Sequence, residues 1–130
     1  MLSENTEQIA RIIVNSAFKV HRELGPGLLE RVYEVCLAHE IQKIGLQVQR
    51  QIKIPIVYDG IIFEESLRLD LLVENSIIVE VKAIEQINPV WDAQIISHLK
   101  LTGKDLGFLI NFNVPLIKNG IKRFINTRKP

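Results

Sequence analysis

The sequence predicts an α/β domain in which two helices precede three strands and a third helix precedes two more, so that helices flank a mixed sheet. Three patterns support this order: apolar residues recur every three or four positions before residue 45, alternate with polar residues around residue 50, and form a nearly unbroken run near residue 108. These patterns are typical of amphipathic helices, half-buried strands and a strand covered on both faces. The 130 residues suit one domain, residues 1–130.

Two helices are expected in the first third of the chain. The helical spacing of apolar residues runs from 6 to 24, and Gly-Pro-Gly at 25–27 ends that helix. A second helix is predicted over residues 28–44, with Gly45 as its C-terminal stop. Its inward-facing residues are expected to be Leu29, Val32, Tyr33, Cys36 and Leu37.

Three consecutive strands should follow as an antiparallel meander. Residues 46–58 alternate between apolar and polar side chains, and Asp59-Gly60 is a strong hairpin signal. Residues 61–73 and the stretch SIIVEVKAI, 76–84, are the next two strands, with a polar tip between them. Together they supply three neighbouring strands of the sheet.

The last third of the chain predicts one helix and two strands. Asn88 is expected as an N-cap and Pro89 as a first-turn residue of a helix that ends near Thr102. Residues 105–113 are nearly all apolar and predict a strand buried on both faces, and residues 120–126 predict a final short strand.

Composition excludes few classes of function. Lys and Arg number 16 and Asp and Glu 15, so the formal charge of +1 neither requires nor excludes a nucleic-acid partner. The single cysteine, Cys36, excludes an internal disulfide and a cysteine-built zinc site. No apolar run is long enough to span a membrane and the first residues lack a signal-peptide pattern, so a cytoplasmic location with no membrane contact is expected.

Charged residues interrupt the apolar strand SIIVEVKAI in an informative way. Because side chains alternate along a strand, Glu80 and Lys82 share a face with Ile78, and the opposite face is entirely apolar. The preceding strand has the same pattern, with Asp70 on its polar side. Its apolar side is expected to contain Leu67, Leu69, Leu71 and Val73.

The register of this hairpin decides what the charges can do. A three-residue loop at 74–76 would place Asp70 opposite Glu80, where Cβ atoms lie about 4.5–5.5 Å apart and like charges are unfavourable. Two such carboxylates call for a cation such as Mg²⁺, with Lys82 acting on a phosphate or a water. A slip of two residues would instead pair Asp70 with Lys82 in an ordinary salt bridge, which spacing alone favours.

Three separated motifs resemble one known family. Asp70 with Glu80 and Lys82 resembles the catalytic signature of the PD-(D/E)XK nuclease-like superfamily, although Leu69 stands in the proline position of its name. Gly27, Glu30 and Tyr33 in GPGLLERVY resemble the GxxExxY family. The later stretch AQIISHLKLTGKDLGFLINFN is similar to that family's following helix and strand, so the resemblance covers residues 21–113.

The resemblance implies a restriction-endonuclease-like fold and hydrolysis of nucleic acid, DNA or RNA, with Mg²⁺ or Mn²⁺. It implies that Asp70 and Glu80 are metal ligands, that Lys82 is the catalytic lysine, and that Glu30 is an additional acidic ligand. Gln94 is implied as a further catalytic residue on the third helix. The family's tyrosine four residues later is His98 here.

Several residues keep two interpretations. His98 could replace that tyrosine or only fill space, and His21 could approach Glu30 or cap its helix. Tyr33 is expected in the core with its hydroxyl group paired, and Trp91 and Phe63 are also expected in the core. Basic residues near the C-terminus could contact phosphates: Lys118, Lys122, Arg123, Arg128 and Lys129.

Two functions therefore remain in consideration. The first is a metal-dependent nuclease. The second is a non-catalytic module that retains the nuclease fold and binds nucleic acid or protein. An apolar edge strand could in either case support a homodimer.

Overall fold

The centre of the protein is a five-stranded sheet with the strand order β1-β2-β3-β4-β5, in a computed structural model that describes residues 2–127. β3 and β4 are parallel and the other neighbours are antiparallel, so the sheet is mixed as predicted. A short 3-10 helix before the last strand is the one unpredicted addition within these residues. The elements are α1 (Glu4–Leu24), α2 (Glu30–Lys43), β1 (Val48–Tyr58), β2 (Ile61–Val73), β3 (Ile77–Lys82), α3 (Val90–Thr102), β4 (Leu106–Asn111), η1 (Ile117–Gly120) and β5 (Ile121–Ile125).

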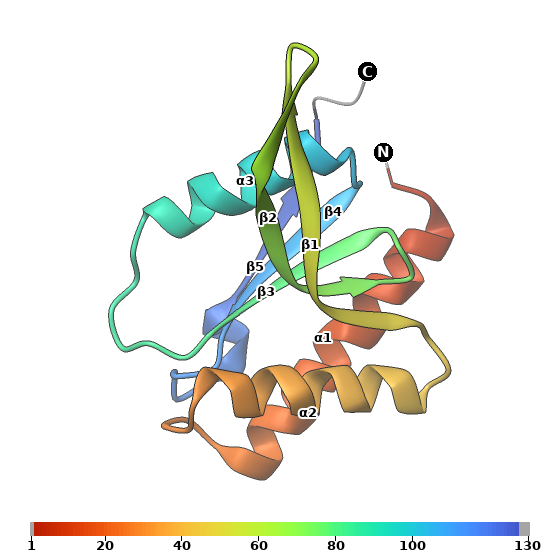
Figure 1. The fold of residues 1–130 in the computed structure, drawn as a ribbon. Helices are drawn as coiled ribbons and strands as arrows, with labels where there is room; N and C mark the ends of the chain where they lie inside the picture. The colour runs from red at the N-terminus through yellow and green to blue at the C-terminus, as the bar shows by residue number, and fades with distance from the viewer. Residues whose placement is uncertain (1, 128–130) are drawn as a thin grey trace.

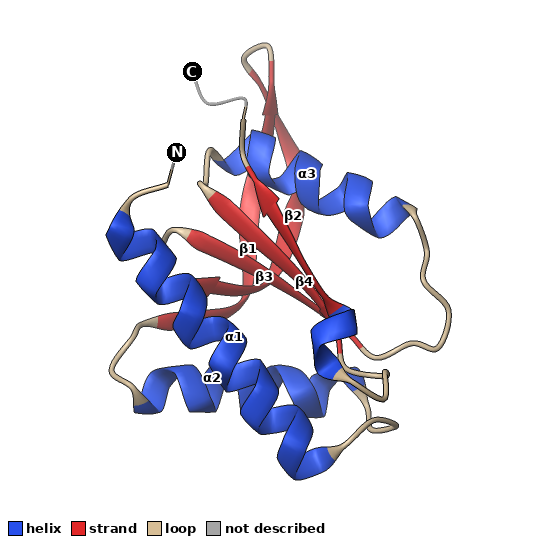
Figure 2. Cartoon of the chain, turned by 180° about the vertical axis from the view of Figure 1, so that it is seen from behind, coloured by secondary structure: helices blue, strands red, loops and turns tan. Residues whose placement is uncertain are grey.

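Helices cover both faces of the sheet and create two apolar cores. α1 and α2 pack together against one face, and α3 lies on the other (Figures 1 and 2). The larger core contains residues of α1, α2 and β2 to β4. The smaller core, beneath α3, consists of Leu69, Leu72, Ile78 and Leu99.

The buried stripe of α2 differs from the predicted one. Tyr33 and Leu37 are fully buried as expected, but Leu29 and Val32 are 76% and 38% exposed. Leu29 is the N-cap of the helix rather than part of it. The buried stripe instead includes Glu34, a charged residue that pairs with Arg50 of β1.

The alternation in β3 is confirmed, and that in β2 is only partly correct. Val79 packs in the larger core and Ile78 in the smaller one, so the two faces of β3 serve different cores. In β2, however, Leu71 joins the larger core whereas Leu69 joins the smaller one. The prediction that Leu69 and Leu71 share one apolar surface is therefore wrong, because the strand changes its packing partners at Asp70.

The last third of the chain follows the predicted pattern with a shifted helix start. All six residues of β4 are buried, as expected for a strand covered on both faces. Pro89, rather than Asn88, is the N-cap of α3. The Asn88 side chain still serves the helix start, because its Oδ1 accepts a hydrogen bond from the Val90 amide at 3.0 Å.

The β1–β2 hairpin extends beyond the helices (Figure 1). Its outer part is exposed and apolar, with Tyr58 71% and Ile62 75% accessible. Phe63 is 40% exposed, so its predicted place in the core is wrong: it lies where the hairpin has left both cores. None of the helices among residues 2–127 is long and apolar enough to cross a membrane.

Candidate functional site

β2 and β3 separate at Asp70. Their ladder pairs Val73 with Ile77, the predicted register, and ends where Leu71 pairs with Val79. Beyond that point the contact between the strands comes from the Asp70 side chain, because its Oδ2 accepts a hydrogen bond from the Val81 amide at 2.8 Å. The Asp70 carboxylate is thereby held beside Glu80 at the end of the paired segment.

Glu80 is a buried carboxyl group, with 9% of the residue exposed. Burial raises its pKa, the hydrogen bond from His98 partly opposes this, and the neighbouring Asp70 raises it again, to about 7. The His98 Nδ1 atom lies 3.4 Å from Glu80 Oε1. Because burial and a second carboxylate both disfavour the charged form, a cation nearby would stabilise ionised Glu80.

Glu30, the first residue of α2, lies within electrostatic reach of the same group. Burial raises its pKa, the charge of Asp70 raises it further, and the charge of Lys82 opposes them. The turn before Glu30 is closed by Tyr33, whose hydroxyl donates to the Gly25 carbonyl oxygen and accepts from the Leu28 amide. Tyr33 is thus in the core with its hydroxyl paired, as expected.

Lys82 approaches the site from the end of β3. Its Nζ atom lies 5.3 Å from the centre of the Trp91 ring on α3, a cation–π contact. The Lys82 carbonyl oxygen accepts a hydrogen bond from the Phe112 amide at 2.9 Å, which holds the strand end in place. Lys82 is therefore held at both its backbone and its ammonium group. Trp91 is half-buried rather than fully in the core.

An open groove of about 530 Å³ lies between Ala83, which follows Lys82, and Leu28, two residues before Glu30. Its walls come from the turn before α2 and from the loop after β3. The loop is fixed by Asn111, whose Oδ1 accepts from the Ile84 amide and whose Nδ2 donates to the Ile84 carbonyl oxygen. The lining residues are Gly27, Leu28, Ala83, Ile84, Glu85, Gln86 and Asn113.

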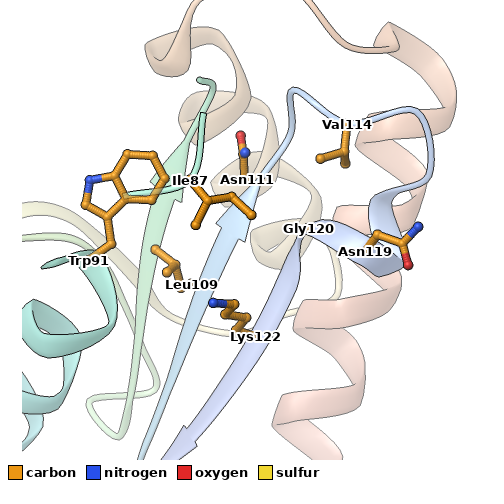
Figure 3. Close-up of a pocket in the computed structure, with 8 residues that line it drawn as sticks. All are labelled: Ile87, Trp91, Leu109, Asn111, Val114, Asn119, Gly120 and Lys122. Atoms are coloured by element: carbon orange, nitrogen blue, oxygen red, sulfur yellow. The ribbon is translucent and has the colours of Figure 1, made fainter. Parts of the chain in front are cut away.

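A second cavity adjoins the Trp91 ring but is much smaller. Figure 3 shows Trp91 and Leu109 on one side of it and Val114 and Asn119 on the other. Its volume of about 30 Å³ suits a water molecule rather than a nucleotide. The larger groove is accordingly the better of the two for a nucleotide, and its lining reaches Ala83, the residue after Lys82.

The donor atoms at this site fit a hard divalent cation. Asp70 and Glu80 provide carboxylate oxygens, which are the ligands that Mg²⁺ and Mn²⁺ prefer. Among residues 2–127, no three or more His, Cys, Asp or Glu side chains are arranged to hold a metal ion together. Two carboxylates are nevertheless sufficient for Mg²⁺, which commonly takes its other ligands from water and substrate phosphate.

The raised pKa of Glu80 gives a testable dependence of stability on pH. The folded protein binds this proton more tightly than the unfolded chain does, so its contribution to stability is lost as the pH rises from about 4.5 to about 7. Glu80→Gln should therefore leave the free energy of unfolding nearly unchanged at pH 4 and increase it by about 2–3 kcal/mol at pH 8. Urea unfolding in EDTA at the two pH values measures this.

Glu64→Gln is the matched control for that experiment. Glu64 is exposed on the outer part of β2, so this change removes one negative charge without removing a buried carboxylate. Its stability should follow that of the wild type at both pH values. A Glu80→Gln effect of equal size at pH 4 and pH 8 would contradict the assigned ionisation.

The other candidate residues are placed as follows. Gln94 is exposed on α3, and its side chain forms no hydrogen bond with the residues that the structure describes. His98, one turn later, is the α3 residue that contacts Glu80. His21 is buried and donates from Nε2 to the Val114 carbonyl oxygen, away from Glu30. Arg128 and Lys129 lie outside the described residues.

Sequence reasoning missed one group of residues beside the site. Gln51 of β1 contacts Asp70, and Glu34 of α2 contacts Gln51. No sequence motif marks either residue. The one weak signal for this group was the position of Glu34, a charged residue that directly follows Tyr33 on the buried stripe of α2.

Comparison with known proteins places the chain in a family. A family model described as the PD-(D/E)XK nuclease superfamily matches residues 7–124. The chain belongs to the PD-(D/E)XK nuclease superfamily. The mixed sheet flanked by helices agrees with the restriction-endonuclease-like fold of this superfamily, and membership suggests nuclease activity. Comparisons with curated proteins and with solved structures give no match.

Proposed function

We propose that this protein hydrolyses phosphodiester bonds of nucleic acid with the help of Mg²⁺ or Mn²⁺. The observation that carries the proposal is the Asp70–Glu80 carboxyl pair, in which half-buried Asp70 lies beside buried Glu80 where β2 and β3 separate, with Lys82 on the same strand end. A salt bridge between Asp70 and Lys82, the simpler interpretation of the sequence, receives no support from the observed register.

Asp70 and Glu80 would hold the metal ion in this proposal. A divalent ion supplies Lewis-acid polarisation of the phosphate and neutralises its charge. It would also stabilise the ionised form of Glu80. His98, within 3.4 Å of Glu80, would orient the Glu80 carboxylate from the opposite side.

The cationic and polar residues around the carboxylates have separate roles. The Lys82 ammonium would stabilise negative charge that develops on the phosphate or orient the attacking water. Glu30, within the field of Asp70 and Lys82, would orient a water molecule or a second ion. Gln94 lies on the exposed side of α3. It would contact a phosphate of the substrate only if the bound nucleic acid extends over α3.

The proposed substrate is DNA or RNA lying in the groove between residues 27–28 and 83–86. The finer assignment to the GxxExxY family rests on Gly27, Glu30 and Tyr33. Support for it comes from the contacts of Tyr33, which closes the turn that ends directly before Glu30.

Metal-dependent cleavage is the direct test. The purified protein should cleave DNA or RNA oligonucleotides with Mg²⁺ or Mn²⁺ and lose that activity in EDTA. Asp70→Asn should abolish cleavage, whereas Asp59→Asn should retain it, because Asp59 lies in the exposed β1–β2 turn and its positive φ of 50° is one that Asn tolerates. Equal activity of Asp70→Asn and wild type would refute the proposal.

A non-catalytic interaction module is the alternative function. The exposed apolar hairpin favours it, since Tyr58, Ile61 and Ile62 are each more than half accessible. β1 is also an edge strand, through which a second copy could pair. Such a module would bind its partner without cleaving nucleic acid, and Asp70→Asn would leave both the calorimetric response to Mg²⁺ and the mass measured by light scattering unchanged.

A further inference from the structure

A chain of polar contacts reaches Asp70 from α2, on the side of β1. Glu34 is only 3% exposed, and its Oε2 accepts from Arg50 Nε at 3.2 Å and from Arg50 Nη2 at 2.9 Å. Its other oxygen, Oε1, accepts from Gln51 Nε2 at 2.7 Å. The same Gln51 nitrogen lies 3.4 Å from Asp70 Oδ1. Gln51 thus connects buried Glu34, which is paired with the more exposed Arg50, to the proposed metal ligand.

The chemistry of these groups determines how the Gln51 amide must be oriented. A carboxylate only accepts hydrogen bonds, and an amide NH₂ group has two hydrogens to donate. Only the nitrogen end of the amide can therefore face Glu34 and Asp70 together. Arg50 occupies the second oxygen of Glu34, which leaves Oε1 for Gln51.

The backbone of Gln51 is unusual for a strand. Its φ of 52° lies in the left-handed region, which is unfavourable for a residue with a side chain. Its neighbours pair normally, Arg50 with Leu71 and Ile52 with Leu69, but Gln51 and Asp70 do not pair in the ladder. The strained residue of β1 is thus the one next to Asp70, and strain of this kind is concentrated at functional sites.

We propose that Gln51 is a positioning residue that fixes the Asp70 carboxylate for metal binding. Asp70 Oδ2 is held by the Val81 amide and Oδ1 by Gln51, so the two contacts together define the rotation of the carboxylate. The amide also offsets part of the repulsion between Asp70 and Glu80. That the positioned carboxylate binds a metal ion rests on the proposed function. That Gln51 positions Asp70 does not depend on that function.

Two measurements on Gln51→Met test the proposal, because methionine keeps the length of the side chain but donates no hydrogen bond. Calorimetric titration with Mn²⁺ should show a dissociation constant raised about 10-fold, the lower end of the effect of removing a residue that orients a metal ligand. In the metal-free protein, the Val81 amide hydrogen should exchange several-fold faster by NMR after correction for global stability measured in urea.

Gln49→Met is the matched control. Gln49 lies two residues earlier in β1, is exposed, and has no hydrogen-bonding contact with Asp70. It should change neither Mn²⁺ affinity nor Val81 exchange. Unchanged affinity and exchange in Gln51→Met would overturn the proposal, as would equal effects in both variants.

The two readouts separate this proposal from the proposed function. If wild type binds no Mn²⁺ but Gln51→Met accelerates Val81 exchange, the positioning of Asp70 stands and the metal-dependent function falls. If wild type binds Mn²⁺ and neither readout responds to Gln51→Met, the function stands and Gln51 has no positioning role.

Discussion

Lys82→Ala is expected to lower the rate of phosphodiester cleavage by about 100- to 10,000-fold, the range for loss of a positioned charged or proton-transferring group. The ammonium group that is removed lies over Trp91, and the backbone bond between Lys82 and Phe112 is retained. The fold and the affinity for Mn²⁺ should therefore persist. Cleavage of a labelled oligonucleotide under single-turnover conditions measures the change.

Lys100→Ala is the control for that result. Lys100 is exposed on α3 and forms no ion pair among the residues that the structure describes. Its removal takes away one positive charge at a distance from the carboxylates and should change the rate less than twofold. If Lys82→Ala cleaves as fast as Lys100→Ala, Lys82 is not the catalytic lysine.

Tyr33→Ala is expected to have the largest effect on stability, a loss of about 3–5 kcal/mol in the free energy of unfolding. Tyr33 is fully buried and its ring stacks on Phe112, with 4.6 Å between the ring centres and 5° between the planes. Tyr33→Phe keeps the ring but leaves the Leu28 amide and Gly25 carbonyl without the hydroxyl, and should lose about 1–3 kcal/mol. Urea denaturation measures both values.

Tyr58→Ala provides the comparison for Tyr33. Tyr58 is 71% exposed at the end of β1, so its removal should change the free energy of unfolding by less than about 0.5 kcal/mol. Similar losses for Tyr33→Ala and Tyr58→Ala would show that the stacked ring is not part of the core.

The order of elements was predictable because apolar periodicity is a local signal. The buried stripe of α2 was not predictable, because it depends on which residues from distant segments of the chain pack against the helix. Glu34 can be buried only because Arg50 and Gln51, 16 and 17 residues later, reach its carboxylate. Periodicity alone therefore placed Val32 inward and overlooked Glu34.

The candidate site was predictable to the extent that it follows from strand alternation. Asp70 and Glu80 could be placed side by side from the length of the loop between their strands, and the observed register agrees. The contact of His98 with Glu80 depends on how α3 lies across the sheet, and the contact of Gln51 with Asp70 depends on a positive φ. Neither property is contained in a repeat of polar and apolar residues.

The change of core partners between Leu69 and Leu71 has a consequence for the motions of the protein. Before Asp70, β2 contributes Leu69 to the smaller core alone, whereas after Asp70 it is held in both cores, by Leu71 in the larger and Leu72 in the smaller one. The outer hairpin can therefore open locally while the helices α1 and α2 stay packed, because segments with few buried contacts unfold at lower free energy than the rest. Asp70 lies at the hinge of that opening, so a cation bound there would join two units that otherwise fluctuate separately.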